Sequence, residues 1–228
     1  MTLNLKTNTT VALLSTLLCA AIGAAQTPSS VDRPALKVGN SWTYQTVDLY
    51  TKNVLLTTTE SVREVKSDGY ILKQSRNGAA EQEIVKSLDL GTCLRSKDAT
   101  QPPVCLNFLH FPLTEGKSYG LEKIPLIGDV TMKEAQCVIK KLEPTETPAG
   151  TFDSVPVKCT GTWNRPAEGK TDYFGHFELT YWYAPRIGSV VKRHLERRAS
   201  ITNVRKDMKG RLETYIDTTL THYSATSQ

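Results

Sequence analysis

The chain has 228 residues, of which 39% are hydrophobic and 22% are charged, and its formal net charge at pH 7 is +5. This length favours one globular domain with a substantial core. The charge is only mildly basic and by itself predicts no binding to nucleic acid. Beyond the N-terminal region, no segment approaches the roughly 20 apolar residues that a membrane-spanning helix needs. Length, composition and charge therefore exclude a protein with several membrane spans.

The first 25 residues have the three parts of a cleavable secretory signal peptide. Lys6 precedes an apolar stretch at residues 11–25, and Gly23 and Ala25 are small residues that a signal peptidase accepts before the cut. Because Lys6 is the only charged residue in the leader, cleavage lowers the formal net charge from +5 to +4. We expect a periplasmic or extracellular protein with no transmembrane segment in the mature chain.

Two other readings of the N-terminus remain open. The apolar stretch could stay uncleaved as a membrane anchor, or Cys19 could carry a lipid, although lipidation favours a small residue before the cysteine and Leu18 stands there. In the reading we prefer, the chain divides into a signal peptide (1–25), a polar linker (26–35) and a single β-rich globular domain (36–225).

The rest of the chain predicts one strand after another, separated by turn signals such as Ser67-Asp68-Gly69 and Asn77-Gly78. The strands are expected at residues 41–50, 54–66, 70–75, 83–90 (strand or short helix), 117–122, 128–142, 152–163, 172–183, 189–201 and 211–223. The last has the clearest alternation of apolar and polar residues, which is typical of a strand with one face on a core. The fold class predicted is mainly β, an antiparallel meander curled into a half-barrel, barrel or sandwich, with little helix.

Four cysteines remain after cleavage, and an even number in an exported chain indicates two disulfides. We favour Cys93–Cys105, which would close a polar loop with two prolines, and Cys137–Cys159, because each of these two shares a strand face with apolar neighbours. A zinc site is the rival, but no Cys-x-x-Cys pair exists and the histidines are scattered. We therefore expect no metal and no cofactor.

Three motifs carry a resemblance to a known group of proteins: Gly39-x-x-Trp42-x-Tyr44, then PAGTF at residues 148–152, then YWYAPRIGSV at residues 181–190. They resemble a family of exported bacterial β-proteins with no assigned function. That family is similar in kind to half-barrel carriers of the lipoprotein-localisation type, so the resemblance implies a curved sheet around an apolar cavity. As local structure, both longer motifs predict turns in which Gly150 and Gly188 are free to take positive φ.

No catalytic signature occurs in the sequence. The nucleophile elbow, the phosphate-binding loop, the dinucleotide-binding glycines and His-Glu-x-x-His are all absent. His176 has Asp172 and Glu178 nearby, but such residues are more often polar strand or turn positions than acid–base machinery. We therefore do not expect an enzyme, and a hydrolase is only a distant alternative.

The candidate ligand-binding residues lie on two neighbouring strands. Tyr181 and Tyr183 share a strand face with other apolar residues and could line a partly wet pocket, since a buried tyrosine needs a partner for its hydroxyl. Arg193 and Arg197 share a face with four apolar residues, namely Val191, Leu195, Ala199 and Ile201. Either a bulge turns these side chains apart, or two arginines point inward and need an anionic partner.

Two functional classes follow from these observations. The first is a non-enzymatic binding module, in which a curved sheet holds an amphiphilic or anionic ligand between the two tyrosines and the two arginines. The second is an envelope component that binds another protein through its surface. A carrier should contain a large apolar cavity, whereas an interaction component should have a filled core.

The export signal gives a direct prediction. N-terminal sequencing of the protein recovered from outside the cytoplasm should begin at Gln26 or within a few residues of it. Recovery of a mature protein that begins at Met1 would contradict cleavage.

Overall fold

The structure is a computed structural model, and it describes residues 30–94, 103–125, 130–165, 173–200 and 211–225. The expected signal peptide lies outside these ranges. Within them the regular structure is almost entirely β, with one 3-10 turn, η1 (Pro185–Ile187). In the described ranges no helix has the length and apolar character that spanning a membrane requires. The predicted mainly β fold class is confirmed.

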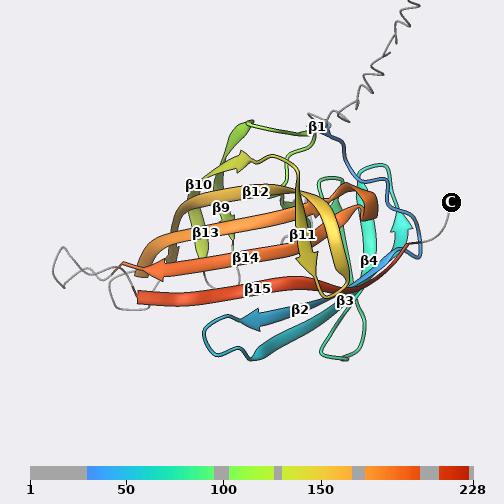
Figure 1. The fold of residues 1–228 in the computed structure, drawn as a ribbon, viewed down its shortest axis with the longest axis horizontal. Coiled ribbons are helices and arrows are strands. Elements are labelled where there is room, and N and C mark those ends of the chain that lie inside the picture. Colours follow the sequence, from blue (N-terminus) through green and yellow to red (C-terminus); the bar gives the residue numbers. More distant parts are fainter. Residues whose placement is uncertain (1–29, 95–102, 126–129, 166–172, 201–210, 226–228) are drawn as a thin grey trace, which may run out of the picture.

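The strands form two antiparallel meanders (Figure 1). The N-terminal meander contains β2 (Ser41–Asp48), β3 (Val54–Val65), β4 (Gly69–Arg76), β5 (Gln82–Ser87), β6 (Thr92–Leu94) and β7 (Val104–Leu106). The C-terminal meander contains β9 (Ser118–Pro125), β10 (Thr131–Ile139), β12 (Gly150–Arg165), β13 (Tyr173–Ala184), β14 (Ser189–Ala199) and β15 (Arg211–Ser224). In each meander, strands that follow one another along this list pair with one another.

One pairing joins the two meanders into a single curved sheet. The last strand, β15, pairs antiparallel with the first strand of the N-terminal meander, β2, and we call this pairing the seam. The strand order then runs from β7 to β9, and these two end strands do not pair with each other in the described residues. The sheet therefore curls without closing, as Figure 1 shows, and of the shapes predicted a closed barrel is not formed.

Of three further short strands, two form a separate two-stranded sheet and one joins the curved sheet. β1 (Ser30–Val31) pairs with β8 (Leu113–Thr114), and β11 (Glu143–Thr147) pairs with the beginning of β12. The sequence analysis expected no strand between residues 142 and 152 and therefore missed β11. Proline is tolerated at the edge of a sheet, and in the described residues β11 pairs only with β12. The ambiguous segment 83–90 contains a strand, β5, and no helix.

The predicted turns form where glycine was expected to take positive φ. Gly150 has a φ of 125° in the β11–β12 hairpin, and Gly188 has a φ of 65° at the end of η1, between β13 and β14. Asn77 and Gly78 have φ values of 50° and 73° and connect β4 to β5. Local sequence therefore determines these three connections.

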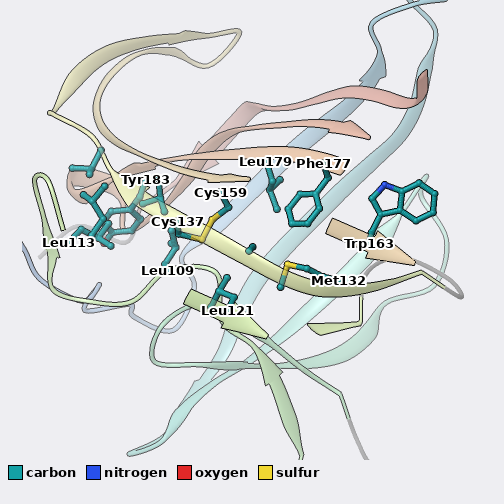
Figure 2. Close-up of a cluster of buried hydrophobic side chains, with 14 of the residues drawn as sticks. Leu109, Leu113, Leu121, Met132, Cys137, Cys159, Trp163, Phe177, Leu179 and Tyr183 are labelled. Atoms are coloured by element: carbon teal, nitrogen blue, oxygen red, sulfur yellow. A yellow bond between two sulfur atoms is a disulfide. The ribbon is translucent and has the colours of Figure 1, made fainter. Parts of the chain in front are cut away.

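The core lies on one face of the C-terminal meander. Residues directly opposite each other in antiparallel strands project to the same side, and we call the inner face the side that carries Cys137, Cys159 and Leu179, which are neighbours across three strands. The segment between β7 and β9 crosses this face and buries Leu109 and Leu113 against it. Figure 2 shows the Cys137–Cys159 disulfide within this cluster, between Leu109 and Leu179.

Both predicted disulfides are present. Cys93–Cys105 links β6 to β7, and Cys137–Cys159 links β10 to β12, each between residues directly opposite in the ladder. Two disulfides are typical of a protein that folds in an oxidising compartment.

The buried disulfide gives a test of the core. Replacing Cys137 and Cys159 together by Ala should lower the free energy of unfolding by about 3–4 kcal/mol, because the bridge closes a loop with a sequence separation of 22 and its sulfur atoms fill the core. Urea denaturation measures this change. A loss smaller than about 1 kcal/mol would contradict the structural role given to this bridge.

Candidate functional site

The sequence-predicted Tyr181 and Arg193 lie directly opposite each other on the inner face. They belong to a row of side chains that crosses six strands and the seam. The row, in order from β12 to β3, is Val157, Tyr181, Arg193, Thr218, Thr46 and Leu56. Its middle members Tyr181, Arg193 and Thr218 are half-buried. The two meanders therefore build this row together, and neither could build it alone.

Arg193 has only neutral partners in the described part of the chain. Its Nη2 donates a hydrogen bond of 3.1 Å to Oγ1 of Thr218, whose hydroxyl oxygen is in turn 2.9 Å from that of Thr46. Burial raises the pKa of the Tyr181 hydroxyl, and the neighbouring guanidinium of Arg193 only partly offsets this effect. Among described residues, the buried Nε of Arg193 has no hydrogen-bond partner and no carboxylate pairs with its guanidinium. A cation in such surroundings favours an anionic partner.

Arg197, by contrast, is neutralised within the protein. Its Nη2 lies 3.5 Å from Oε2 of Glu213, and its guanidinium lies 4.9 Å from the ring centroid of Trp163. The indole N–H of Trp163 donates to the carbonyl oxygens of His176 and Arg198, at 3.1 and 3.2 Å. Gly175, opposite Trp163, lies so close to β14 that a Cβ there would meet the backbone of Arg198 and Ala199. Arg197 therefore has a structural role that accounts for its charge.

The carboxylate of Glu60 on β3 is a second charge of the inner face, and it pairs with Lys86 on β5. Glu60 is buried, and it accepts hydrogen bonds from Lys86 Nζ at 2.5 Å and from Gln74 Nε2 at 2.8 Å. Burial by itself would raise the pKa of Glu60, but the charge and hydrogen bonds of Lys86, with help from Gln74 and Arg76, hold that pKa below its ordinary value. Glu60 therefore stays ionised, and its charge is matched by Lys86.

These three charges of the inner face differ in one respect. Glu60 and Arg197 each have a partner of opposite charge, whereas Arg193 is surrounded by hydroxyl groups. The sequence could not separate Arg193 from Arg197, because the difference depends on which residues β13 and β15 place beside each of them. Arg193 is therefore the strongest candidate for binding an anion.

Tyr183 lies apart from this row. It is fully buried and packs edge-on against Phe111, with ring centroids 5.0 Å apart, while Tyr181 contacts Phe108 at 5.4 Å. Tyr183 also lines a cavity of about 460 Å³, whose size is within the range of about 300–1,000 Å³ of small-molecule sites. Residues 30–35, Leu142, Asp153, Pro185 and Arg186 form the rest of its lining. Tyr181 and Tyr183 thus share one strand face and contact the same core cluster, but only Tyr181 belongs to the row of Arg193.

A bulge in β14 corrects part of the sequence analysis. Tyr183 is opposite Val190 and Trp182 is opposite Lys192, so Val191 is an extra residue without a cross-strand partner. Val191 packs in a second core cluster, with Leu36 and Trp42 among its members, whereas Leu195 packs against the first cluster. Val191 therefore lies outside the regular alternation that places Arg193 and Leu195 on one face of β14. Ile201 lies outside the described residues.

The sequence analysis missed a charged cluster on the opposite, outer face. Nδ1 of His194 lies 2.6 Å from Oδ1 of Asp217, and Lys192 Nζ lies 3.3 Å from Oδ2 of the same carboxylate. Lys192 also lies over the ring of Trp182, 5.3 Å from its centroid. Only the register of β14 and β15 brings these residues together, so sequence spacing gave no signal. Among the described residues no group of three His, Cys, Asp or Glu side chains could hold a metal ion.

The fold and the disulfides define an antiparallel β-sheet protein of the kind found in oxidising compartments. One similar solved structure is a predicted lipoprotein from Parabacteroides distasonis, with a TM-score of 0.42, 17% identity, and coverage of 86% of this chain and 99% of the other. Another is a predicted exported protein with a YmcC-like fold from Bacteroides fragilis, with a TM-score of 0.44, 16% identity and the same coverage. Likeness of this degree establishes neither a shared family nor a shared function. The chain matches no protein-family model and no curated protein.

The Glu60–Lys86 pair makes the stability of the protein depend on pH. Because the folded-state pKa of Glu60 is lowered, its stabilising contribution is complete above the pKa of the unfolded chain, about 4.3, and is lost as the pH falls through the folded-state value. Glu60→Gln leaves Lys86 unpaired and should lower the free energy of unfolding by about 3 kcal/mol at pH 7. The difference from the parent should shrink below about pH 4.

Urea denaturation at pH 7 and at pH 3 to 4 measures both effects. Glu83→Gln is the matched control, because Glu83 pairs with Arg63 in a more exposed position and should change stability by less than about 1 kcal/mol. A Glu60→Gln variant as stable as the parent at pH 7 would contradict the role of this pair.

Proposed function

We propose that this protein is a non-enzymatic binding module that holds an anionic amphiphile on the inner face of its curved sheet. Arg193 binds the anionic head group, and the hydroxyl groups of Tyr181 and Thr218 lie beside it. The apolar part of the ligand lies against half-buried members of the same face, Leu195 and Leu56.

The observation that carries this proposal is the charge of Arg193. A half-buried guanidinium with neutral partners and one buried N–H left over is unfavourable unless an anion binds it. Two other charges of the same face, on Glu60 and Arg197, are matched inside the protein. A carboxylate or phosphate head group would supply for Arg193 what Glu213 supplies for Arg197.

A second function is an envelope component that binds another protein through its surface. The observation that favours it is the filling of the inner face over β12 and β13, where Phe108, Leu109 and Phe111 pack against the tyrosines and the core. Under this alternative Arg193 needs no ligand, and the protein does not bind amphiphiles.

The test compares two arginine variants. Arg193→Gln should fold with little change in stability, on the order of 0.5 kcal/mol, because no carboxylate in the described ranges pairs with Arg193. It should bind a dansyl-labelled fatty acid roughly 10- to 100-fold more weakly than the parent, since hydrogen bonds to charged groups contribute about 1.5–3 kcal/mol. Thermal unfolding and a fluorescence titration measure the two effects.

Arg197→Gln is the matched control. It should destabilise the protein by about 1–3 kcal/mol, because Glu213 and Trp163 lose their partner, while fatty-acid affinity in the folded variant stays near that of the parent. The uncharged methyl ester of the same probe should not distinguish Arg193→Gln from the parent. A parent that binds no amphiphile would end this proposal and leave the interaction component as the better account.

A further inference from the structure

The turn between β2 and β3 carries the largest concentration of exposed apolar side chains in the described chain. Tyr50 is 82% exposed, Val54 is 53% exposed and Leu55 is 52% exposed, and residues 50–55 are exposed without interruption. We call residues 49–55 the tip. Figure 1 shows the β2–β3 connection at the periphery of the molecule. Exposed apolar side chains that gather in this way mark an interaction site.

The tip is held in one conformation by its own hydrogen bonds. The carboxylate of Asp48 accepts hydrogen bonds from the backbone N–H groups of Tyr50 and Thr51, both at 2.8 Å. The backbone N–H of Lys52 donates to the carbonyl oxygen of Asp48, and that of Leu49 donates to the carbonyl oxygen of Tyr215 in β15. The tip is therefore preorganised and presents its apolar side chains without the cost of ordering a loop.

Two opposite charges lie at the tip, those of Asp48 and Lys52. The hydrogen bond from the backbone of Thr51 is the largest of the effects that lower the pKa of Asp48, so this carboxylate is ionised and occupied by two N–H groups. The remaining charge of the tip is the exposed ammonium of Lys52, beside Tyr50. One aromatic, two aliphatic and one basic side chain match the boundary between the acyl chains and the anionic head groups of a lipid bilayer.

We infer that the tip docks the protein on an anionic lipid surface. Tyr50, Val54 and Leu55 enter the boundary region, and Lys52 binds the head groups. A membrane fits better than a protein partner because the feature is a narrow protrusion, whereas stable protein interfaces bury more than about 1,000 Å² with good complementarity. This inference does not depend on a ligand at Arg193. The tip is nonetheless continuous with the inner face, because Leu55 is followed by Leu56, the last member of the Arg193 row.

Vesicle flotation of the mature chain tests the inference. Vesicles of phosphatidylcholine are compared with vesicles of equal parts phosphatidylcholine and phosphatidylglycerol. The parent should bind the anionic vesicles, and Tyr50→Ser, Val54→Ser and Leu55→Ser combined should weaken this binding by at least about tenfold. Lys52→Gln should weaken it by about fivefold on anionic vesicles and not at all on neutral ones.

The control combines Val65→Ser and Val104→Ser, two exposed apolar residues at the opposite end of β3 and in β7, and should bind as the parent does. Thermal unfolding verifies that every variant is folded. The inference is overturned if the triple variant binds vesicles as well as the parent, or if the parent binds neither kind of vesicle. It is also overturned if light scattering shows a parent dimer that the triple variant cannot form, because the tip would then be a self-association site.

Discussion

The seam between β2 and β15 is the constraint on which the rest of the structure depends. Thr46 and Thr218 are 172 positions apart in the sequence, yet they are direct partners in this ladder and their hydroxyl oxygens are 2.9 Å apart. A contact of such long range repays its loop-closure entropy only when many neighbouring contacts form with it. Here the seam makes one sheet out of two meanders, and it extends the inner face from β12 across to β3.

Because the inner face is continuous, the charges of Glu60, Arg193 and Arg197 all lie on the same side of one sheet. Removed from bulk water, a charged group on the inner face needs a partner, and the fold supplies one for Glu60 in the N-terminal meander and one for Arg197 in the C-terminal meander. Arg193 lies one strand from the seam, between Tyr181 and Thr218, and the hydroxyl of Thr218 contacts that of Thr46 in the N-terminal meander. The guanidinium of Arg193 is therefore the group through which we expect the sheet to bind an anionic amphiphile.

Sequence reasoning succeeded where the determining interactions are local. Gly150 and Gly188 form the expected turns, and the cysteines of neighbouring strands pair as expected, because backbone preference and strand periodicity act over a few residues. It failed where register decides the outcome. The contrast between Arg193 and Arg197, the bulge at Val191 and the contact of His194 with Asp217 each depend on which residue of a neighbouring strand lies opposite. The strand β11 was missed because Pro144 signals a break unless its strand is known to lie at an edge.

The central claim is that Arg193 has no anionic partner among the residues that the structure describes, and one measurement tests it most directly. Thr218→Glu places a carboxylate opposite Arg193, and Thr218→Gln places a neutral side chain of the same size there. If Arg193 lacks an anion, urea denaturation at pH 7 should show the Glu variant to be more stable than the Gln variant by about 1–3 kcal/mol, since it gains a charge-assisted hydrogen bond. A Glu variant less stable than the Gln variant would contradict the account, because it would mean that the charge of Arg193 is already balanced and the new carboxylate is the group left without a partner.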